Sequence, residues 1–340
     1  MILKLLSLLL LLYIPFFIFS RLKLGKVLSS STLSVEQIFS DDHSWTATLS
    51  AQRKRVIIAT GDVLPARAIN IKTIRFNNFN WPYEETADVL RSGDLTFINL
   101  ETSLIKNCPQ TSGGFKFCGD ERNVSGLVFA GVDVANLANN HSGNYGLSGV
   151  DNTVNLLNSN GILVTGTNGP IYKESIGVKF AFLGYNDTGP NVNDKKMQTE
   201  IGEAQKNADI VIVAFHWGVE YVSQPNSRQK YLGRLAVDSG ADLVIGNHPH
   251  WIQPVEIYKG KLINYALGNF VFDQMWSIKT RQGVVGKYTF YDNQLVDAEF
   301  LPVLIHDYGQ PTFLSNSQKK KVLDEMKAES VKLIREFHQN

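Results

Sequence analysis

The sequence predicts an α/β fold, and two features of the chain support this class. Short apolar runs rich in β-branched residues alternate with more polar stretches whose apolar residues recur at helical spacing, as when buried strands alternate with helices. Nearly every apolar run also ends in a carboxylate, an amide or an imidazole, and ligands of open α/β sheets bind at the carboxyl ends of strands. The composition agrees with a globular core, because 44% of the 340 residues are hydrophobic and 19% are charged.

The alternating pattern predicts individual strands and helices from residue 55 onward. Strands are expected at residues 56–60, 95–100, 134–138, 179–183, 210–214, 243–245 and 262–267, and helices at 83–91, 148–159 and 227–239. Residues 284–291 and 295–301 meet at Asp292-Asn293-Gln294 and predict an antiparallel hairpin. Residues 318–337 predict a basic amphipathic helix that lies on the surface of the domain.

The N-terminus predicts a membrane anchor. Residues 5–19 are almost wholly apolar, and with residues 1–3 they can span a hydrocarbon core of roughly 30 Å if Lys4 extends to the interface. No small-residue cleavage site follows the run, so an uncleaved signal anchor is favoured over a removed signal peptide. A buried helix is disfavoured because the run has no polar face. The basic residues on its two sides do not settle its orientation.

These patterns divide the chain into four parts. We expect a transmembrane signal anchor at 1–24, a Ser- and Thr-rich linker with at most one short helix at 25–54, a folded domain at 55–315 and a C-terminal amphipathic helix at 316–340.

Cys108 and Cys118 are the only cysteines, and they bracket a short turn-rich segment. This spacing predicts a disulfide in an oxidising compartment. The alternatives are a metal-binding pair or two free thiols, although no second pair completes a zinc site. Together with the anchor, the disulfide predicts a single-pass protein of the cell membrane whose domain lies outside the cytoplasm. The balance of 33 basic and 32 acidic residues argues against a nucleic-acid partner.

The polar residues at the strand ends predict a metal site. They are Asp62, Glu101, Asn140 with His141, His216, and His248 with His250. One histidine at a strand end is usually structural, but four of the seven histidines together with carboxylates and an amide indicate a cation. The mixture of oxygen and nitrogen ligands suits divalent first-row metals. A serine-based triad is the alternative, but Ser142 lacks the strained Gly-x-Ser-x-Gly elbow.

Six short motifs follow one another along the chain. They are Gly61-Asp62-Val-Leu-Pro-Ala-Arg67, Asn99-Leu-Glu101-Thr, Asn139-Asn140-His141, His216-Trp-Gly-Val-Glu-Tyr221, His248-Pro-His250-Trp-Ile-Gln253 and Leu267-Gly-Asn-Phe-Val-Phe272. In this order they resemble the motifs of the CapA family of poly-γ-glutamate capsule biosynthesis proteins. The resemblance covers roughly residues 55–304. That family is similar to the calcineurin-like metallophosphoesterases, which implies a four-layer α/β/β/α sandwich for the 55–315 domain.

The resemblance also implies two divalent metal ions, Mn, Fe or Zn, and a role for each motif residue. The implied metal ligands are Asp62, Glu101 in the bridging position (which Asn99 could share), Asn140, His216, His248 and His250. His141 resembles the general acid. Arg67 is expected either to clamp an anionic substrate group or to form a surface salt bridge.

Two departures from the family pattern concern the ligands. The first motif lacks an Asp-x-His pair, and Asn144 stands where many members carry Asp. Glu220 is expected either to contact a ligating imidazole or to start a helix or lie on the surface. Asn269 and Asp273 are expected either to orient ligands or to cap a turn.

The function implied is metal-dependent hydrolysis of an anionic phosphoester or γ-glutamyl amide in the synthesis of a capsule polymer. The alternative is a non-catalytic component that holds the polymer or the capsule synthase subunits at the membrane. A soluble intracellular phosphatase is disfavoured by the apolar N-terminus.

Overall fold

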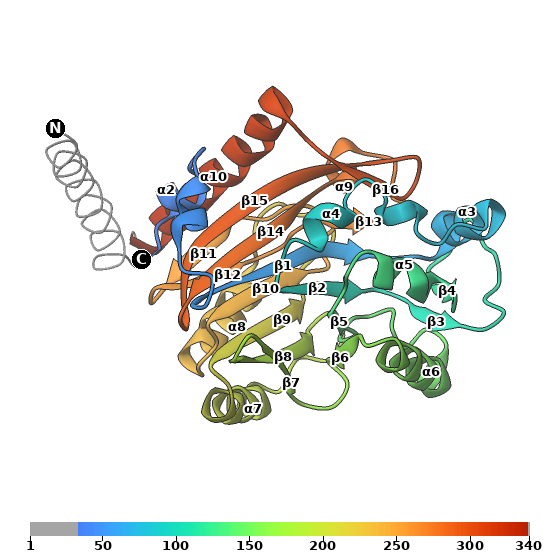
Figure 1. Cartoon of the computed structure of the whole chain (residues 1–340), viewed down its shortest axis with the longest axis horizontal. Helices are drawn as coiled ribbons and strands as arrows, with labels where there is room; N and C mark the ends of the chain where they lie inside the picture. Colours follow the sequence, from blue (N-terminus) through green and yellow to red (C-terminus); the bar gives the residue numbers. More distant parts are fainter. Residues whose placement is uncertain (1–32, 339–340) are drawn as a thin grey trace, which may run out of the picture.

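The computed structural model describes residues 33–338, which form two mixed β-sheets that face one another, with helices on their outer sides (Figure 1). The predicted α/β fold is therefore confirmed. The first sheet contains, in spatial order, β16 (Gln310–Phe313), β15 (Gln294–His306), β14 (Gln282–Tyr291), β1 (Lys54–Val63), β2 (Leu95–Leu100), β5 (Val134–Asn136) and β6 (Leu163–Thr165), with β13 (Asn269–Val271) paired to β1. The second sheet contains β11 (Val255–Tyr258), β12 (Lys261–Asn264), β10 (Leu243–Asn247), β9 (Ile210–His216), β8 (Val178–Asn186) and β7 (Ile171–Ser175).

Each sheet contains a set of neighbouring parallel strands. In the first sheet β1, β2, β5 and β6 are parallel, whereas β14, β15 and β16 continue the sheet in antiparallel pairs. In the second sheet β8, β9, β10 and β12 are parallel, with β7 and β11 antiparallel at the edges. The predicted hairpin is confirmed by the pairing of β14 with β15, in which Asp292 adopts a positive φ at the turn.

Alternation of side chains along the strands creates three apolar layers. Between the sheets, Ala59 of β1, Phe97 of β2 and Phe182 of β8 pack in one buried cluster, and the two phenylalanine rings stack at 5.8 Å. The opposite face of β1, which includes Ile58, packs with residues of the helices that follow β1, β2 and β5. Those helices are α3 (Arg67–Phe76), α4 (Ala87–Leu90), α5 (Asn123–Phe129) and α6 (Gly146–Ser159).

The outer face of the second sheet is covered by α7 (Asp194–Asn207) and α8 (Ser227–Asp238). Met197 and Ile201 of α7 are fully buried there, which accounts for the apolar positions of an otherwise polar helix. The sequence predicted α6 and α8 but not α3, α5 or α7. It predicted one helix at residues 83–91. The structure instead has the short 3₁₀ helix η2 (Trp81–Tyr83) followed by the short helix α4.

Part of the predicted linker belongs to the folded unit. Helix α2 (Val35–Ile38) begins with a capping box formed by Ser34 and Gln37, and the 3₁₀ helix η1 (Ser44–Thr48) follows. Leu33 and Ile38 are buried in the core between the sheets, and α2 contacts β15 and the C-terminal helix α10 (Asn316–His338). Residues 33–49 therefore pack on the domain instead of forming a free stalk.

Helix α10 lies against β11 and β15, as the surface position predicted for this segment requires. Its apolar face is buried through Val322, Met326 and Leu333. The anchor predicted at residues 1–24 lies outside the described residues. Among the helices of residues 33–338, none has the length and apolar character needed to cross a membrane.

Candidate metal centre

The candidate site lies at the carboxyl ends of strands from both sheets. Asp62 is close to the end of β1, in register with Asn99 of the parallel strand β2, and Glu101 directly follows β2. In the second sheet His216 ends β9, in register with Asn247 at the end of β10. Side chains in register on neighbouring strands point to the same face of a sheet. The two sheets therefore bring these polar side chains to a shared edge, as the strand-end pattern predicted.

Gly61 allows β1 to approach β13 closely. A Cβ atom at Gly61 would lie 2.1 Å from the carbonyl oxygen of Gly268, so no larger residue fits. The backbone amide of Asp62 donates a 2.9 Å hydrogen bond to that carbonyl, and Asp62 is in register with Asn269. The first and last motifs of the series therefore meet through a glycine contact.

Glu101 occupies the middle of the cluster without a hydrogen-bond donor. Its side chain is fully buried, and neither carboxylate oxygen finds a partner within residues 33–338. The Nε2 atoms of His141, His216 and His250 each lie 3.9 Å from its Oε1 atom, too far for a hydrogen bond. Two ligand atoms that share one ion are about 3–4 Å apart when each metal–ligand bond is about 2.1 Å long. An unpaired buried carboxylate is costly, so the arrangement fits a bound cation.

Burial shifts the pKa values in this cluster toward neutral side chains. It raises the pKa of Glu101 well above its usual range, and the neighbouring Asp62 carboxylate adds to the shift. It lowers the pKa of His216 well below its usual range and that of His248 to about 4. Neutral imidazoles are the form that binds metal ions, and a nearby cation favours an ionised carboxylate. The donor set therefore suits a divalent ion.

Asn269 fixes the orientation of His250. Its Nδ2 atom donates to the carbonyl of Thr280 at 2.8 Å, so its Oδ1 atom faces Nδ1 of His250 at 2.9 Å. An amide oxygen only accepts, so the proton of a neutral His250 ring is on Nδ1, and the lone pair of Nε2 faces Glu101. Ligating histidines are commonly held through their second nitrogen in this way. Of the two roles expected for Asn269, the structure thus favours ligand orientation.

The loop that carries His248 and His250 has an unusual backbone. These residues have φ values of 96° and 57°, in a region that residues other than glycine rarely adopt. The loop is held by Asp62, whose Oδ2 atom accepts a 3.3 Å hydrogen bond from the amide of His248 and lies 3.1 Å from Nδ1 of His250. Strained backbone of this kind persists where surrounding contacts enforce it, often at functional sites.

Asn140 and His216 converge from opposite sheets. Asn140 is exposed, and its Oδ1 atom lies 2.8 Å from Nε2 of His216. Asn139 holds the Asn140 loop in place, because its Nδ2 atom donates to the carbonyl of Leu100 at 2.8 Å and its Oδ1 atom accepts from the amide of His141 at 3.1 Å. The buried end of β2 therefore sets the position of the Asn140 amide.

Asn99 contacts two of the predicted ligands, Asp62 and His216, through its side-chain nitrogen. Its Nδ2 atom donates to Asp62 Oδ1 at 2.8 Å and contacts His216 Nδ1 at 3.2 Å. Its Oδ1 atom accepts a 3.0 Å hydrogen bond from Asn136, so both ends of the amide are engaged with protein groups. Of the two, Glu101 has both oxygens available for a bridging role.

His141 lies at the more open side of the cluster, with 12% of its side chain exposed. Its Nδ1 atom is 3.1 Å from Oδ1 of Asn144, which also accepts a 2.7 Å hydrogen bond from a backbone amide. Burial lowers the pKa of His141 below its usual value. Asn144 thus provides an amide oxygen to the His141 ring.

Two further residues belong to the site, and sequence patterns gave them no definite role. A carboxylate oxygen of Glu220 and ring nitrogens of His248 and His250 all lie within 4.8 Å of one another. Asp62, Glu101 and His216 form a second group with the same spacing. Asn247 is buried, and its side-chain amide meets no hydrogen-bond partner in the described part of the chain. Glu220 follows His216 by four residues in a loop, and sequence spacing does not fix the direction of a loop.

Replacing Glu220 with Gln is expected to reduce the bound metal from about two ions per chain to about one. The substitution removes the only carboxylate of the group that contains His248 and His250, whereas the Asp62 group is unchanged. Elemental analysis of the purified chain measures the result, with Glu174→Gln, an exposed position on β7, as the control. Two ions retained by Glu220→Gln would exclude Glu220 from the ligand set.

Arg67 lies beside the cluster in a largely buried ion pair. Its guanidinium binds the Asp273 carboxylate, and the two side chains are only 10% and 5% exposed. Its Nη1 atom also donates a 3.2 Å hydrogen bond to the carbonyl of Gly114. The positive charge of Arg67 opposes the upward shift in the pKa of Glu101. Arg67 therefore forms a salt bridge, as one of the two expectations held, but in a largely buried position and not at the surface. Asp273 orients this cation.

Comparisons with known proteins agree with the motif series. Residues 56–274 match the model of a family described as bacterial capsule synthesis protein PGA_cap. The chain is 30% identical over 286 residues to the PGA biosynthesis protein CapA of Bacillus subtilis (strain 168), covering 77% of this chain and 75% of that protein. It is 27% identical over 307 residues to the capsule biosynthesis protein CapA of Bacillus anthracis, covering 82% and 74%. A crystal structure of a hypothetical protein from Thermus thermophilus has a TM-score of 0.50 at 16% identity, covering 73% of this chain and 98% of that one.

Proposed function

This chain belongs to the PGA_cap family of bacterial capsule synthesis proteins, and on that basis we propose that it is a hydrolase that uses two divalent metal ions. Its substrate is an anionic phosphoester or γ-glutamyl amide of a capsule polymer. The observation that carries the proposal is the Glu101 carboxylate, which is fully buried, lacks hydrogen-bond donors within residues 33–338 and has three imidazole nitrogens 3.9 Å from one oxygen.

Two groups of side chains provide the ligands. The first group is Asp62, Glu101 and His216, and the second is Glu220, His248 and His250. Asn140 adds its amide oxygen next to His216. The mixture of carboxylate, amide and imidazole donors suits Mn, Fe or Zn, in a site of the kind that metallophosphoesterases use. When bound, such ions act as Lewis acids and lower the pKa of water.

His141 donates a proton during the reaction, and Arg67 attracts the negative charge of the substrate. A water molecule loses one proton to the solvent as its oxygen adds to the phosphorus or carbonyl centre, and the P–O or C–N bond breaks. A protonated His141 donates its proton from Nε2 to the departing atom and regains a proton from the solvent. Asn144 holds the other ring nitrogen at 3.1 Å and so keeps Nε2 directed toward the cluster. Arg67 contributes a fixed positive charge that attracts an anionic substrate.

The names of the relatives and the sequence support a proposal for the polymer and for the compartment. The Bacillus subtilis relative is named for PGA biosynthesis, so a poly-γ-glutamate-type polymer is the first candidate substrate. We place the domain outside the cytoplasm on a single-pass anchor at residues 1–24. The Cys108–Cys118 disulfide supports an oxidising compartment.

Metal analysis combined with a substrate screen tests the proposal. The purified full-length chain is expected to contain about two equivalents of Mn, Fe or Zn, and to hydrolyse at least one phosphomonoester, phosphodiester or γ-glutamyl peptide in a metal-dependent way. Less than one equivalent of metal would overturn the proposal. A fully loaded protein with no turnover, whose His141→Ala variant also abolishes polymer production in cells, would favour the non-catalytic alternative.

A further inference from the structure

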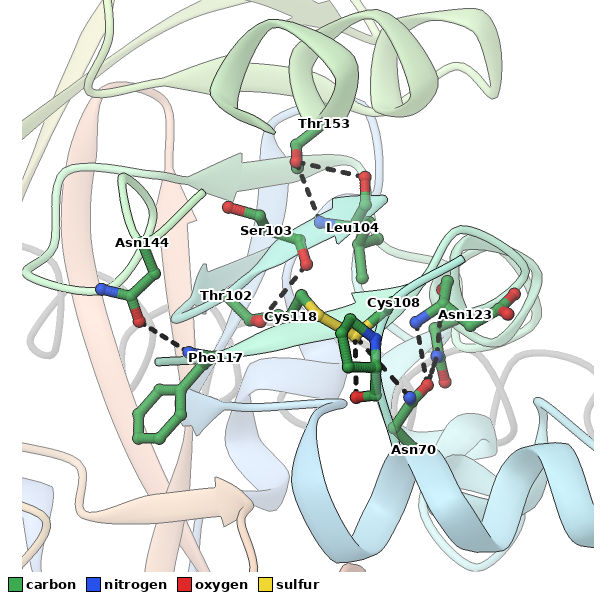
Figure 2. Close-up of a disulfide and its surroundings, with 12 residues drawn as sticks. Asn70, Thr102, Ser103, Leu104, Cys108, Phe117, Cys118, Asn123, Asn144 and Thr153 are labelled. Atoms are coloured by element: carbon green, nitrogen blue, oxygen red, sulfur yellow. Dashed lines mark hydrogen bonds between the residues drawn. A yellow bond between two sulfur atoms is a disulfide. The ribbon is translucent and has the colours of Figure 1, made fainter. Parts of the chain in front are cut away.

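The segment closed by the Cys108–Cys118 disulfide, here called the disulfide loop, reaches the site through Phe117, whose ring contacts His141. Figure 2 shows the disulfide and Phe117. The loop connects β3 (Ser103–Ile105) to β4 (Cys118–Asp120), two short parallel strands in which Ser103 is in register with Cys118. Most of the loop faces solvent, and Phe115 is 83% exposed. Phe117, immediately before the second cysteine, is instead only 3% exposed. The loop thus inserts a single aromatic side chain into the domain.

Phe117 contacts His141 directly through its ring and indirectly through Asn144. Its ring centroid lies 4.0 Å from that of the His141 ring. Its backbone amide donates a 2.7 Å hydrogen bond to Oδ1 of Asn144, the same oxygen that lies 3.1 Å from Nδ1 of His141 (Figure 2 shows the Phe117–Asn144 bond).

These bonds determine which nitrogen of His141 carries the proton. The backbone amide of Phe117 can only donate, so the Asn144 atom that faces it is the oxygen. That oxygen can only accept, so Nδ1 of His141 donates to it. In the neutral ring Nε2 is then unprotonated and available, on the side of Glu101. The backbone position of Phe117 therefore fixes the tautomer of His141 through Asn144.

The disulfide loop also holds Arg67. The guanidinium carbon of Arg67 lies 4.6 Å from the centroid of the Phe117 ring, within cation–π range. The carbonyl of Gly114 accepts a 3.2 Å hydrogen bond from Arg67 Nη1. One loop thus contacts both polar side chains that the proposed function places next to the substrate.

The disulfide restricts where Phe117 can lie. It ties Cys118, the next residue, to Cys108 at the other end of the loop. Asn70 of α3 adds a second tie, because its Oδ1 atom accepts a 2.8 Å hydrogen bond from the amide of Asp120 in β4. Phe117 itself packs in a buried cluster with Leu64, Ala66 and Phe272, whereas residues 109–116 of the loop are exposed. The disulfide therefore adds a covalent constraint at the end of the loop to the packing of the Phe117 ring.

We propose that Phe117, placed by its buried packing and by the Cys108–Cys118 disulfide, is the positioning residue for His141 and Arg67 and so aligns the proton donor. The effect of this alignment on catalysis rests on the proposed function. The alignment itself is a structural property that can be measured separately.

Kinetics of the purified full-length, metal-loaded chain test the catalytic consequence. Phe117→Ala is expected to lower kcat by about 10–100-fold, because a misplacement of about 1 Å can cost 10²-fold, and to leave the metal content unchanged. Phe117→Tyr, which keeps the ring, is expected to retain most of kcat. Phe115→Ala, in the same loop but exposed, is the matched control and should stay within about twofold of the wild type.

Nitrogen NMR of histidine tests the alignment without any turnover. In ¹⁵N-histidine-labelled protein loaded with Zn, we expect the His141 signals, identified by their loss in His141→Ala, to report a single Nδ1-protonated tautomer. Phe117→Ala and the double variant Cys108→Ser/Cys118→Ser are expected to shift these signals toward a mixture of tautomers. If both variants keep the wild-type tautomer, the positioning role is wrong, whether or not the protein proves to be an enzyme. If the wild-type protein shows the single tautomer and the variants lose it, but no substrate is turned over, the positioning role stands and the proposed function fails.

Discussion

Glu101→Gln is expected to leave the purified chain with less than one equivalent of metal and to reduce turnover by at least about 100-fold. Residues that only orient a ligand already cost 10–100-fold in metal affinity or activity when they are replaced. Glu101 is a stronger case, because its two buried oxygens have no other partner in the described structure and three imidazoles face one of them. Elemental analysis and turnover of the best substrate measure both effects.

Although Glu101→Gln should impair metal binding and turnover, we expect it to make the metal-free protein more stable. Burial raises the pKa of Glu101, so the folded state keeps a proton that the unfolded state loses as the pH rises above about 4.3. The wild-type metal-free protein therefore loses stability between that pH and the raised pKa, whereas a glutamine cannot ionise. At pH 7 we expect metal-free Glu101→Gln to melt about 2–4 °C above the metal-free wild type, as relief of about 1 kcal/mol would produce.

Added metal should reverse this order, because it stabilises only a protein that binds it. Differential scanning calorimetry with and without the ion measures the melting temperatures of the variant and the wild type in both states. Glu174→Gln, at an exposed position, is the control and should melt like the wild type in both states. A wild-type protein whose melting temperature is unchanged by Mn, Fe or Zn would contradict the assignment of Glu101 as a ligand.

His141→Ala is expected to keep the metal ions and to lower turnover by about 10²–10⁴-fold on substrates with a poor leaving group. General acid catalysis matters most when the departing atom is strongly basic. The loss should therefore be much smaller on an activated aryl phosphoester, whose leaving group needs no proton. Comparison of an alkyl and a nitrophenyl ester of the same type separates proton donation from metal binding.

The matched control for His141→Ala is His306→Ala, an exposed histidine at the end of β15. It should change neither turnover nor metal content. Equal losses on the two esters, or a drop in bound metal, would place His141 among the metal ligands and not in the role of proton donor.

Much of the fold follows from local sequence pattern. The β2 strand and the β14–β15 hairpin were predicted closely, because each is an apolar run bounded by clear turn residues. Helix α7 was not predicted, because apolar residues are sparse on it and only packing against the second sheet shows which of them are buried. The 83–91 region forms shorter turns than a helical pattern suggested.

The sequence by itself determined the α/β class and the set of polar residues that end the strands. The reason is that strands and their ends are local, and the chemistry of Asp62, Glu101 and the histidines can be identified from residue type alone. It also predicted that Cys108 and Cys118 pair, since they are the only two and close a short loop, and the structure confirms the bond.

Tertiary structure decided which of these residues act together and which only support them. Glu220 joins His248 and His250, Asn269 orients His250, and Arg67 is held by Asp273 in a largely buried pair. Each of these contacts joins segments that are far apart in sequence or lie in loops, and a loop's direction depends on what it packs against. The position of Phe117 between the disulfide and His141 has the same origin, because it depends on a covalent link and an Asn144 hydrogen bond that sequence spacing does not describe.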